Sequence, residues 1–363
     1  MRKNTVVLAS TMAIAAFVAV SGCSVPDSGT TGSTAPAVPA ASAAAPGSGD
    51  TAAGSAGSTG GSSAGGVNEN GPTGGKLLGI VTISATDANN ARVIAGATEA
   101  AEKAGWKVEV VGAAGNADQA NTAIRNFVNK KAGMIFDLVF PTSSLGSGLN
   151  AAQSAGIPVA TWGGGLGTAV VMTTGNGAPF AAPATQAMID AMKGDGAVLA
   201  LTYRTGQVCR DREGLFDTMM KQKAPNVAIT KNEVNIPGFL QDGSRYATAW
   251  LAGHPAGGKP LAVWGCWEDP TLGAISALKQ QGRTDVLTYG INGSSAAIKA
   301  VQDGSLTATV YEDGKGEGRT MFETVLKSAA GGAAKPQTID VPGILVNKDN
   351  IATFLSEHPE ALS

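Results

Sequence analysis

The chain has 363 residues, 43% of them hydrophobic, and its 26 basic and 28 acidic residues give a formal net charge of −2. This near-neutral balance, without a basic block, argues against nucleic acid or an anionic membrane surface as a partner. The only two histidines, His254 and His358, each precede a proline and lie far apart, so a histidine-based metal site or a Ser-His-Asp triad is poorly supported.

The N-terminal residues have the pattern of a secretory signal peptide. Two basic residues precede an apolar run over 6–20, which is too short and too alanine-rich to predict a membrane span. The run leads into a Val-Ser-Gly-Cys motif ending at Cys23, which resembles the bacterial lipobox. The resemblance implies that residues 1–22 are removed and that a diacylglycerol on Cys23 holds the protein at the extracytoplasmic face of the cell membrane. An ordinary signal peptide with an incidental cysteine is the alternative.

Residues 23–75 are predicted to form a disordered tether behind this anchor. They consist almost entirely of Ser, Thr, Gly, Ala and Pro, with no aromatic residue and almost no large aliphatic one. Such a composition cannot bury enough apolar surface to offset the entropy lost on ordering. The tether is expected to be stiffer where its prolines gather, at Pro36, Pro39 and Pro46.

From Leu77 onward, short apolar runs alternate with amphipathic stretches. The runs are unbroken and rich in β-branched residues, which is typical of strands that helices bury on both faces. In the first series the expected strands are 77–83, 108–111, 134–140 and 157–161, and the expected helices are 93–104, 117–129 and 145–155.

A second series follows a break at 163–165 and restarts beyond Pro179. Its expected helices are 184–192, 215–222, 246–251, 272–279 and 296–301, and its expected strands are 197–201, 227–234, 261–265 and 286–289. Strand–helix alternation predicts parallel sheets with right-handed crossovers. Two such series predict two α/β lobes with a cleft, and ligands of open α/β sheets bind at the carboxyl ends of the strands.

Four stretches of the globular part carry a family resemblance; in chain order they are 95–106, 155–159, 209–216 and 297–310. Together they resemble the type 1 periplasmic binding proteins, specifically the ribose-like group that shares its fold with lac-repressor-type regulators. The resemblance implies two Rossmann-like lobes, each a parallel sheet flanked by helices, joined by a three-stranded hinge. The chain would cross near 175–177, 312–314 and 340–343. The N-terminal lobe would comprise 76–176 plus 314–340, and the C-terminal lobe 177–312 plus 341–363.

The same resemblance implies a set of ligand-binding residues. Arg210 matches a ligand-binding arginine at a helix start, and its guanidinium suits paired oxygens; a surface arginine paired with Asp211 or Glu213 is the alternative. Asp87, Asn89 and Asn90 stand where the family has aromatic side chains, and tryptophans stand where polar groups are common. The full predicted set is Asp87, Asn89, Asn90, Trp162, Asn176, Arg210, Trp267, Asn292 and Glu312.

Three interpretations of Trp162 and Trp267 remain open. They could stack on the apolar face of a sugar. With the carboxylates of Asp87, Glu268 and Glu312 they could instead surround a cationic ligand. They could also simply pack in the cores of the lobes.

The resemblance also places Cys209 and Cys266 at the cleft edge of neighbouring strands, so we expect them to form a disulfide, with two buried free thiols as the alternative. An exported protein permits a disulfide. A catalytic cysteine is disfavoured because neither residue has a histidine nearby in sequence.

The resemblance predicts a binding protein and not an enzyme. Its role would be to capture a small polar ligand, foremost a sugar or sugar alcohol, by hinge closure and to present it to an ABC permease. We expect a monomer that uses no cofactor and no metal. The alternatives are a ligand-sensing lipoprotein for a signalling partner, binding of a cationic solute, and an exported hydrolase. Against the hydrolase stands the lack of a Gly-x-Ser-x-Gly elbow and of a phosphate-binding loop.

Overall fold

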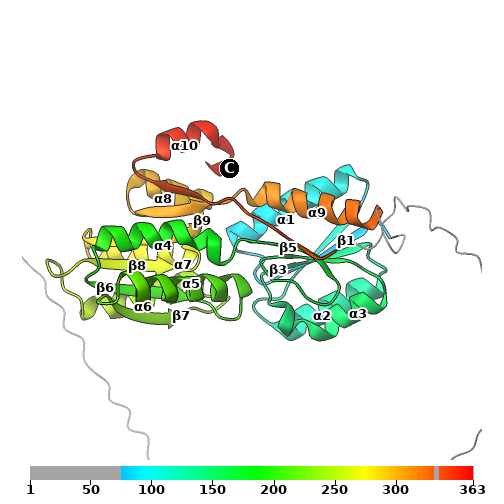
Figure 1. The fold of residues 1–363 in the computed structure, drawn as a ribbon, viewed down its shortest axis with the longest axis horizontal. Helices are drawn as coiled ribbons and strands as arrows, with labels where there is room; N and C mark the ends of the chain where they lie inside the picture. The colour runs from blue at the N-terminus through cyan, green and yellow to red at the C-terminus, as the bar shows by residue number, and fades with distance from the viewer. Residues whose placement is uncertain (1–74, 331–334, 363) are drawn as a thin grey trace, which may run out of the picture. The chain divides into compact units, whose positions relative to one another are not determined.

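The computed structural model describes residues 75–330 and 335–362 (Figure 1). The predicted signal peptide 1–22, the lipidated Cys23 and the tether up to residue 74 lie outside the described residues. Within the described ranges, no helix has both the length and the apolar character needed to cross a membrane.

The described residues form two sheets of six strands (Figure 1). The first has the order β11-β5-β4-β3-β1-β2, and all its strands pair in parallel. Its strands are β1 (Leu77–Thr82), β2 (Lys107–Gly112), β3 (Met134–Leu138), β4 (Val159–Trp162), β5 (Val170–Thr174) and β11 (Gln337–Ile339).

The second sheet has the order β12-β10-β9-β8-β6-β7. Its strands are β6 (Ala197–Thr202), β7 (Ala228–Glu233), β8 (Leu261–Gly265), β9 (Val286–Asn292), β10 (Ala308–Tyr311) and β12 (Ile344–Asn347). Pairing is parallel except between β10 and β12, which is antiparallel. β10 runs out of its sheet toward the first sheet, whereas β12 begins where the chain returns from the first sheet, so the two must run in opposite directions.

Helices cover both faces of the first sheet because alternate strand residues are apolar on each side. Leu78 and Ile80 pack with residues of α1 (Ala88–Lys103) and α9 (Gly314–Ala330). Val81 packs with residues of α2 (Ala117–Asn129) and α3 (Gly146–Ser154), the latter preceded by the short turn η1 (Thr142–Ser144). We call this sheet with its four helices the first lobe.

The second lobe contains the other sheet and the remaining helices. In it α4 packs beside α5, and α6 packs beside α7 (Figure 1). Its helices are α4 (Ala178–Met192), α5 (Gln207–Lys223), α6 (Phe239–Ala252), α7 (Glu268–Gln280), α8 (Ser295–Asp303), α10 (Ile351–Glu357) and the turn η2 (Pro359–Leu362). The chain passes between the lobes three times: between β5 and α4, between β10 and α9, and between β11 and β12.

The two-lobed α/β fold predicted from the sequence is confirmed, although the elements beyond residue 301, namely β10, α9, β11, β12 and α10, were not predicted individually. β5 was not predicted, because its run of five residues follows the glycine-rich break at 163–165. α5 begins at Gln207, eight residues before its predicted start, because its first two turns are mostly polar and lack an apolar stripe. The sheets are also not wholly parallel, because β12 is antiparallel.

Close contact between α1 and α9 depends on a glycine. A Cβ on Gly96 would lie 1.8 Å from the backbone oxygen of Lys315, a distance that no side chain can occupy. The two helices are more than two hundred residues apart in sequence, so this contact joins distant parts of the chain within the first lobe.

Candidate functional site

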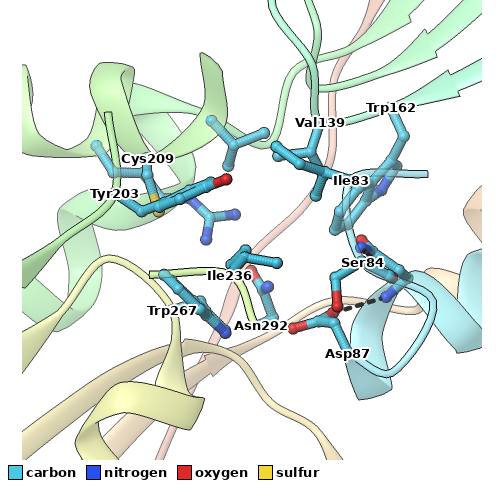
Figure 2. Close-up of a pocket in the computed structure, with 13 residues that line it drawn as sticks. Ile83, Ser84, Asp87, Val139, Trp162, Tyr203, Cys209, Ile236, Trp267 and Asn292 are labelled. Carbon is cyan, nitrogen blue, oxygen red and sulfur yellow. Dashed lines mark hydrogen bonds between the residues drawn. The ribbon is translucent and has the colours of Figure 1, made fainter. Parts of the chain in front are cut away.

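A pocket lies between the lobes, at the carboxyl ends of strands from both sheets (Figure 2). This is where open α/β sheets bind their ligands. It encloses about 390 Å³ of empty space, including space open to solvent. The first lobe contributes Ile83, Ser84, Asp87, Asn90, Val139 and Trp162, and the second contributes Tyr203, Val208, Cys209, Arg212, Ile236, Trp267 and Asn292.

Two of these lining residues have an unusual backbone conformation. Val139, directly after β3, has a φ of 83°, and Asn292, at the end of β9, has a φ of 102°. A positive φ is uncommon for any residue with a side chain and is a genuine outlier for a β-branched one such as valine. Strain of this kind concentrates at ligand sites, where the surrounding structure maintains it.

Five of the nine sequence-predicted ligand residues line the pocket: Asp87, Asn90, Trp162, Trp267 and Asn292. Trp162 and Trp267 approach it from opposite lobes (Figure 2). Both are therefore part of the pocket wall, whatever they also contribute to the cores.

Three further predicted residues are buried behind the wall. The Asn89 side-chain amide donates to Oε1 of Glu268 at 3.2 Å, and the Asn176 amide donates to Oε2 of Glu312 at 3.4 Å. Asn89 belongs to the first lobe and Glu268 to the second. These residues hold the walls of the pocket in place and do not face its interior.

The prediction for Arg210 requires correction. Arg210 is exposed and lies outside the pocket, where its guanidinium donates to Oε1 of Gln207 at 2.6 Å. Arg212, two residues later in α5, is fully buried and lines the pocket. Two residues turn an α-helix by roughly 200°, so the two arginines point to opposite sides. The buried positions of α5 follow a helical period that includes Arg212 and leaves out Arg210. This period was the signal that could have identified Arg212 as the arginine facing the pocket.

Arg212 ties the first crossing of the chain to the second lobe. Its Nε and Nη2 donate to the backbone oxygen of Asn176 at 3.0 and 2.7 Å, and its Nη1 donates to the backbone oxygen of Cys266 at 2.8 Å. Burial lowers the pKa of Arg212 to about 10, an effect that the charges of Glu312 and Glu268 oppose. A guanidinium has five N–H groups, so Arg212 keeps donors for a molecule in the pocket.

The predicted disulfide between Cys209 and Cys266 is present, with the two Cα atoms 5.2 Å apart. It joins the first turn of α5 to the residue that follows β8. Cys209 lines the pocket, and Cys266 provides the carbonyl that Arg212 binds. The covalent link therefore supports the wall that holds Arg212.

Arg92, which the sequence did not single out, connects the lobes directly. It extends from α1 and donates to three backbone oxygens at or just after the ends of β9 and β10: those of Asn292 at 2.9 Å, Glu312 at 3.3 Å and Gly293 at 3.4 Å. It also donates to Oδ1 of Asn89 at 2.7 Å. The lobes are thus closed on each other through contacts made by the protein itself.

Carboxyl groups from both lobes are buried beside the pocket. Asp87 caps α1, accepting from the backbone N–H groups of Asn89 and Asn90 at 3.0 and 2.9 Å. Burial raises the pKa of Asp87 to about 6. Burial, together with the charges of Asp87 and Glu268, raises the pKa of Asp269 in the second lobe to about 9.

These shifts predict that the protein loses stability as the pH rises. A carboxyl whose pKa is higher in the folded state favours folding below its unfolded pKa, and that contribution is lost as the pH passes the folded pKa. The pH range over which this stability is lost runs from 3.8 to about 6 for Asp87 and from 3.8 to about 9 for Asp269. One group shifted by roughly two units accounts for about 3 kcal/mol. Urea titrations from pH 5 to pH 9 should therefore show a falling free energy of unfolding.

The Asp269→Asn variant provides the control for this prediction, because it removes the titrating group and keeps its size. Its profile should be flatter than that of the unaltered protein. A free energy of unfolding that stays constant or rises between pH 5 and pH 9 would contradict the assignment of buried, protonated carboxyls.

Comparison with known proteins identifies the class. Residues 78–333 match the family described as periplasmic binding protein domain, and the chain belongs to that family. The resemblance seen in the sequence is thereby confirmed.

Individual relatives and structures agree with this assignment. The chain is 29% identical over 161 residues to a putative rhizopine-binding protein of Rhizobium meliloti, a match that covers 44% of this chain and half of that relative. It is 25% identical over 252 residues to the ribose import binding protein RbsB of Bacillus subtilis, covering 66% of this chain and 78% of that protein.

Among solved structures, an ABC sugar transporter subunit from Rhodobacter sphaeroides has a TM-score of 0.69 and 26% identity, covering 76% of this chain and 99% of that one. An ABC transporter solute binding protein from Agrobacterium vitis with bound allitol has a TM-score of 0.70 and 24% identity, and the match covers 78% of this chain and 98% of that one. The similarity to the Agrobacterium vitis protein shows a shared fold.

Proposed function

We propose that this protein is a solute-binding protein of an ABC importer that captures a sugar or sugar alcohol between its lobes. The observation that carries the proposal is the interlobe pocket, to which both lobes contribute an aromatic residue and polar groups. A ligand held by both lobes stabilises the closed state more than the open one and so shifts the population toward closure. The names of the ribose-binding relative and of the allitol-bound structure support a polyhydroxyl ligand.

The proposal extends to the parts of the chain that serve this role. The first lobe would comprise 76–176 plus 314–340 and the second 177–312 plus 341–363, with the three crossings acting as hinge. The protein would be anchored through lipid on Cys23 at the extracytoplasmic face of the membrane and would act as a monomer. It would deliver its ligand to an ABC permease and would catalyse no reaction.

Thermal unfolding in the presence of a ligand panel tests the proposal. The panel contains pentoses, hexoses, alditols and inositols, with amino acids as controls. A ligand present at a hundredfold excess over its Kd should add about 2.7 kcal/mol to the free energy of unfolding. Stabilisation by one sugar or polyol and by no amino acid is the expected result. Stabilisation by an amino acid alone would reject a polyhydroxyl ligand.

A further inference from the structure

A hydrogen bond joins the two lobes at the start of α5. The backbone N–H of Gln207, the first residue of this helix, donates to the backbone oxygen of Val139 in the first lobe at 3.0 Å. Gly206 occupies the N-cap position and has no side chain with which to cap the helix. The first N–H groups of a helix lack partners within it, so a carbonyl of one lobe caps a helix of the other.

Val139, which lines the pocket (Figure 2), has its unusual backbone conformation at this contact. Its N–H donates to the backbone oxygen of Trp162 at 3.1 Å and continues the pairing of β3 with β4, whereas its carbonyl leaves the sheet toward α5. The φ of 83° turns the chain between these two bonds. A β-branched residue keeps such a φ only where the surrounding structure maintains it. Here the N-terminal end of a helix, which favours negative partial charge, provides the partner for the carbonyl.

The absence of a side chain at Gly206 allows this close approach. A Cβ on Gly206 would lie 2.9 Å from Cγ1 of Val139, so one of the two groups would have to move. The φ of −90° and ψ of 131° at Gly206 are ordinary for any residue. The backbone conformation therefore does not require glycine at this position, and the space taken by the opposite lobe does.

This contact lies away from the crossings between the lobes. In the first sheet β3 is two places from β5, and in the second sheet β6, which precedes α5, is three places from β10. The chain leaves each sheet for the other lobe from β5 and from β10. Since neighbouring strands are about 4.8 Å apart, the contact is roughly 10 Å from the crossings or further. A rotation about the crossings that opens the lobes would therefore break the bond.

We propose that Val139, Gly206 and Gln207 form a latch that sets the closing equilibrium of the lobes and thereby the affinity for every ligand of the pocket. The latch joins protein to protein, so it favours the closed state with or without a ligand. This rests on the proposed function, because only a protein that closes on its ligand gains affinity from the latch. When the binding-competent state is only partly populated, the affinity falls by that fraction.

Gly206→Ala tests the latch, since the added methyl group would meet Val139 across the cleft. Overpacking of this kind should shift the closing equilibrium roughly tenfold toward the open state. Gly214→Ala is the matched control, because it makes the same change in the same helix, where a Cβ would meet nothing within 4 Å. Urea denaturation establishes that each variant is folded.

Two measurements follow the closing equilibrium. Hydrogen exchange without ligand, observed by NMR spectroscopy, gives the protection factor of the Gln207 amide, which exchanges when the lobes open. Titration calorimetry gives the affinity for ribose and for allitol. A mostly closed protein would show the shift in the protection factor, and a mostly open one would show it in the affinity. The two fold-changes caused by Gly206→Ala should therefore multiply to roughly tenfold, and Gly214→Ala should change neither quantity.

Val139→Ala separates the contact between lobes from effects within the second lobe, where a Cβ on Gly206 would also lie 3.3 Å from Cδ1 of Tyr203. This variant removes Cγ1 and keeps the backbone oxygen that accepts from Gln207. In the Val139→Ala background, Gly206→Ala should shift the closing equilibrium by no more than roughly threefold, a coupling that the double-mutant cycle measures.

Three results would overturn the inference. The first is a Gln207 amide that is unprotected in the unaltered protein, both without ligand and with ribose or allitol. The second is a protection factor and an affinity that Gly206→Ala leaves unchanged. The third is an effect of Gly206→Ala that is equally large in the Val139→Ala background. If neither ribose nor allitol binds but Gly206→Ala lowers the protection factor as expected, the latch is supported and the proposed function is not.

Discussion

Replacing Arg212 with methionine is expected to lower the free energy of unfolding by about 2 to 5 kcal/mol and to abolish stabilisation by ligand. Methionine keeps much of the side-chain volume but removes every donor, so the buried backbone oxygens of Asn176 and Cys266 lose their partner. Each buried acceptor left unsatisfied costs about 1 to 3 kcal/mol. Urea denaturation, with and without a ligand identified from the panel, measures both effects.

Arg210→Met is the matched control, since it makes the same substitution two residues away on the same helix. Arg210 is exposed, and among the hydrogen bonds found in the described residues its guanidinium bonds only to Gln207. Its loss should change the free energy of unfolding by no more than about 0.5 kcal/mol. If Arg210→Met abolished ligand binding and Arg212→Met did not, the corrected assignment of the pocket arginine would be wrong.

Removing the disulfide is the second change with a large expected effect. The double variant Cys209→Ala, Cys266→Ala should lose about 4 kcal/mol, because the bond closes a loop with a sequence separation of 57 residues. Alanine is used because a serine hydroxyl would be buried at these positions, which are 6% and 0% exposed. The effect arises mainly in the unfolded chain, whose freedom the crosslink restricts.

Dithiothreitol provides the control for this measurement. The reductant should lower the stability of the unaltered protein toward that of the double variant and leave the double variant unchanged. Equal stability of the oxidised protein and the double variant would show that the crosslink contributes little. The same samples also show whether the disulfide supports the pocket wall, because the backbone oxygen of Cys266 accepts a hydrogen bond from Arg212.

The sequence predicted the fold well where local pattern and burial coincide. The strand 261–265 and the helix 117–129 were predicted with the bounds that the structure has, because the first is an unbroken apolar run and the second has a clear helical period. The start of α5 was missed because its polar residues face both solvent and protein. Which of them is buried depends on the hydrogen bonds of Arg212 to oxygens 36 and 54 residues away in sequence.

The site was predictable as a location but not as a set of contacts. The family resemblance predicted Asp87, Trp162, Trp267 and Asn292 as ligand residues, and the structure brings all four together in the wall of the pocket. The role of Arg92 could not be foreseen, because its backbone partners in the second lobe lie two hundred or more positions further along the chain. Contacts at such separations are set by the arrangement of the lobes and leave no local pattern.

The three passages of the chain between lobes also determine when each part can fold during synthesis. The first lobe lacks α9 and β11 until the ribosome has passed residue 339, although its first five strands are complete by residue 174. The segment between them contains every strand of the second sheet except the edge strand β12. The apolar face of α1 that α9 covers therefore stays exposed while some hundred and forty residues of the second lobe are synthesised. Chains dominated by such distant contacts fold slowly, and neither lobe is complete until the C-terminal part of the chain has been made.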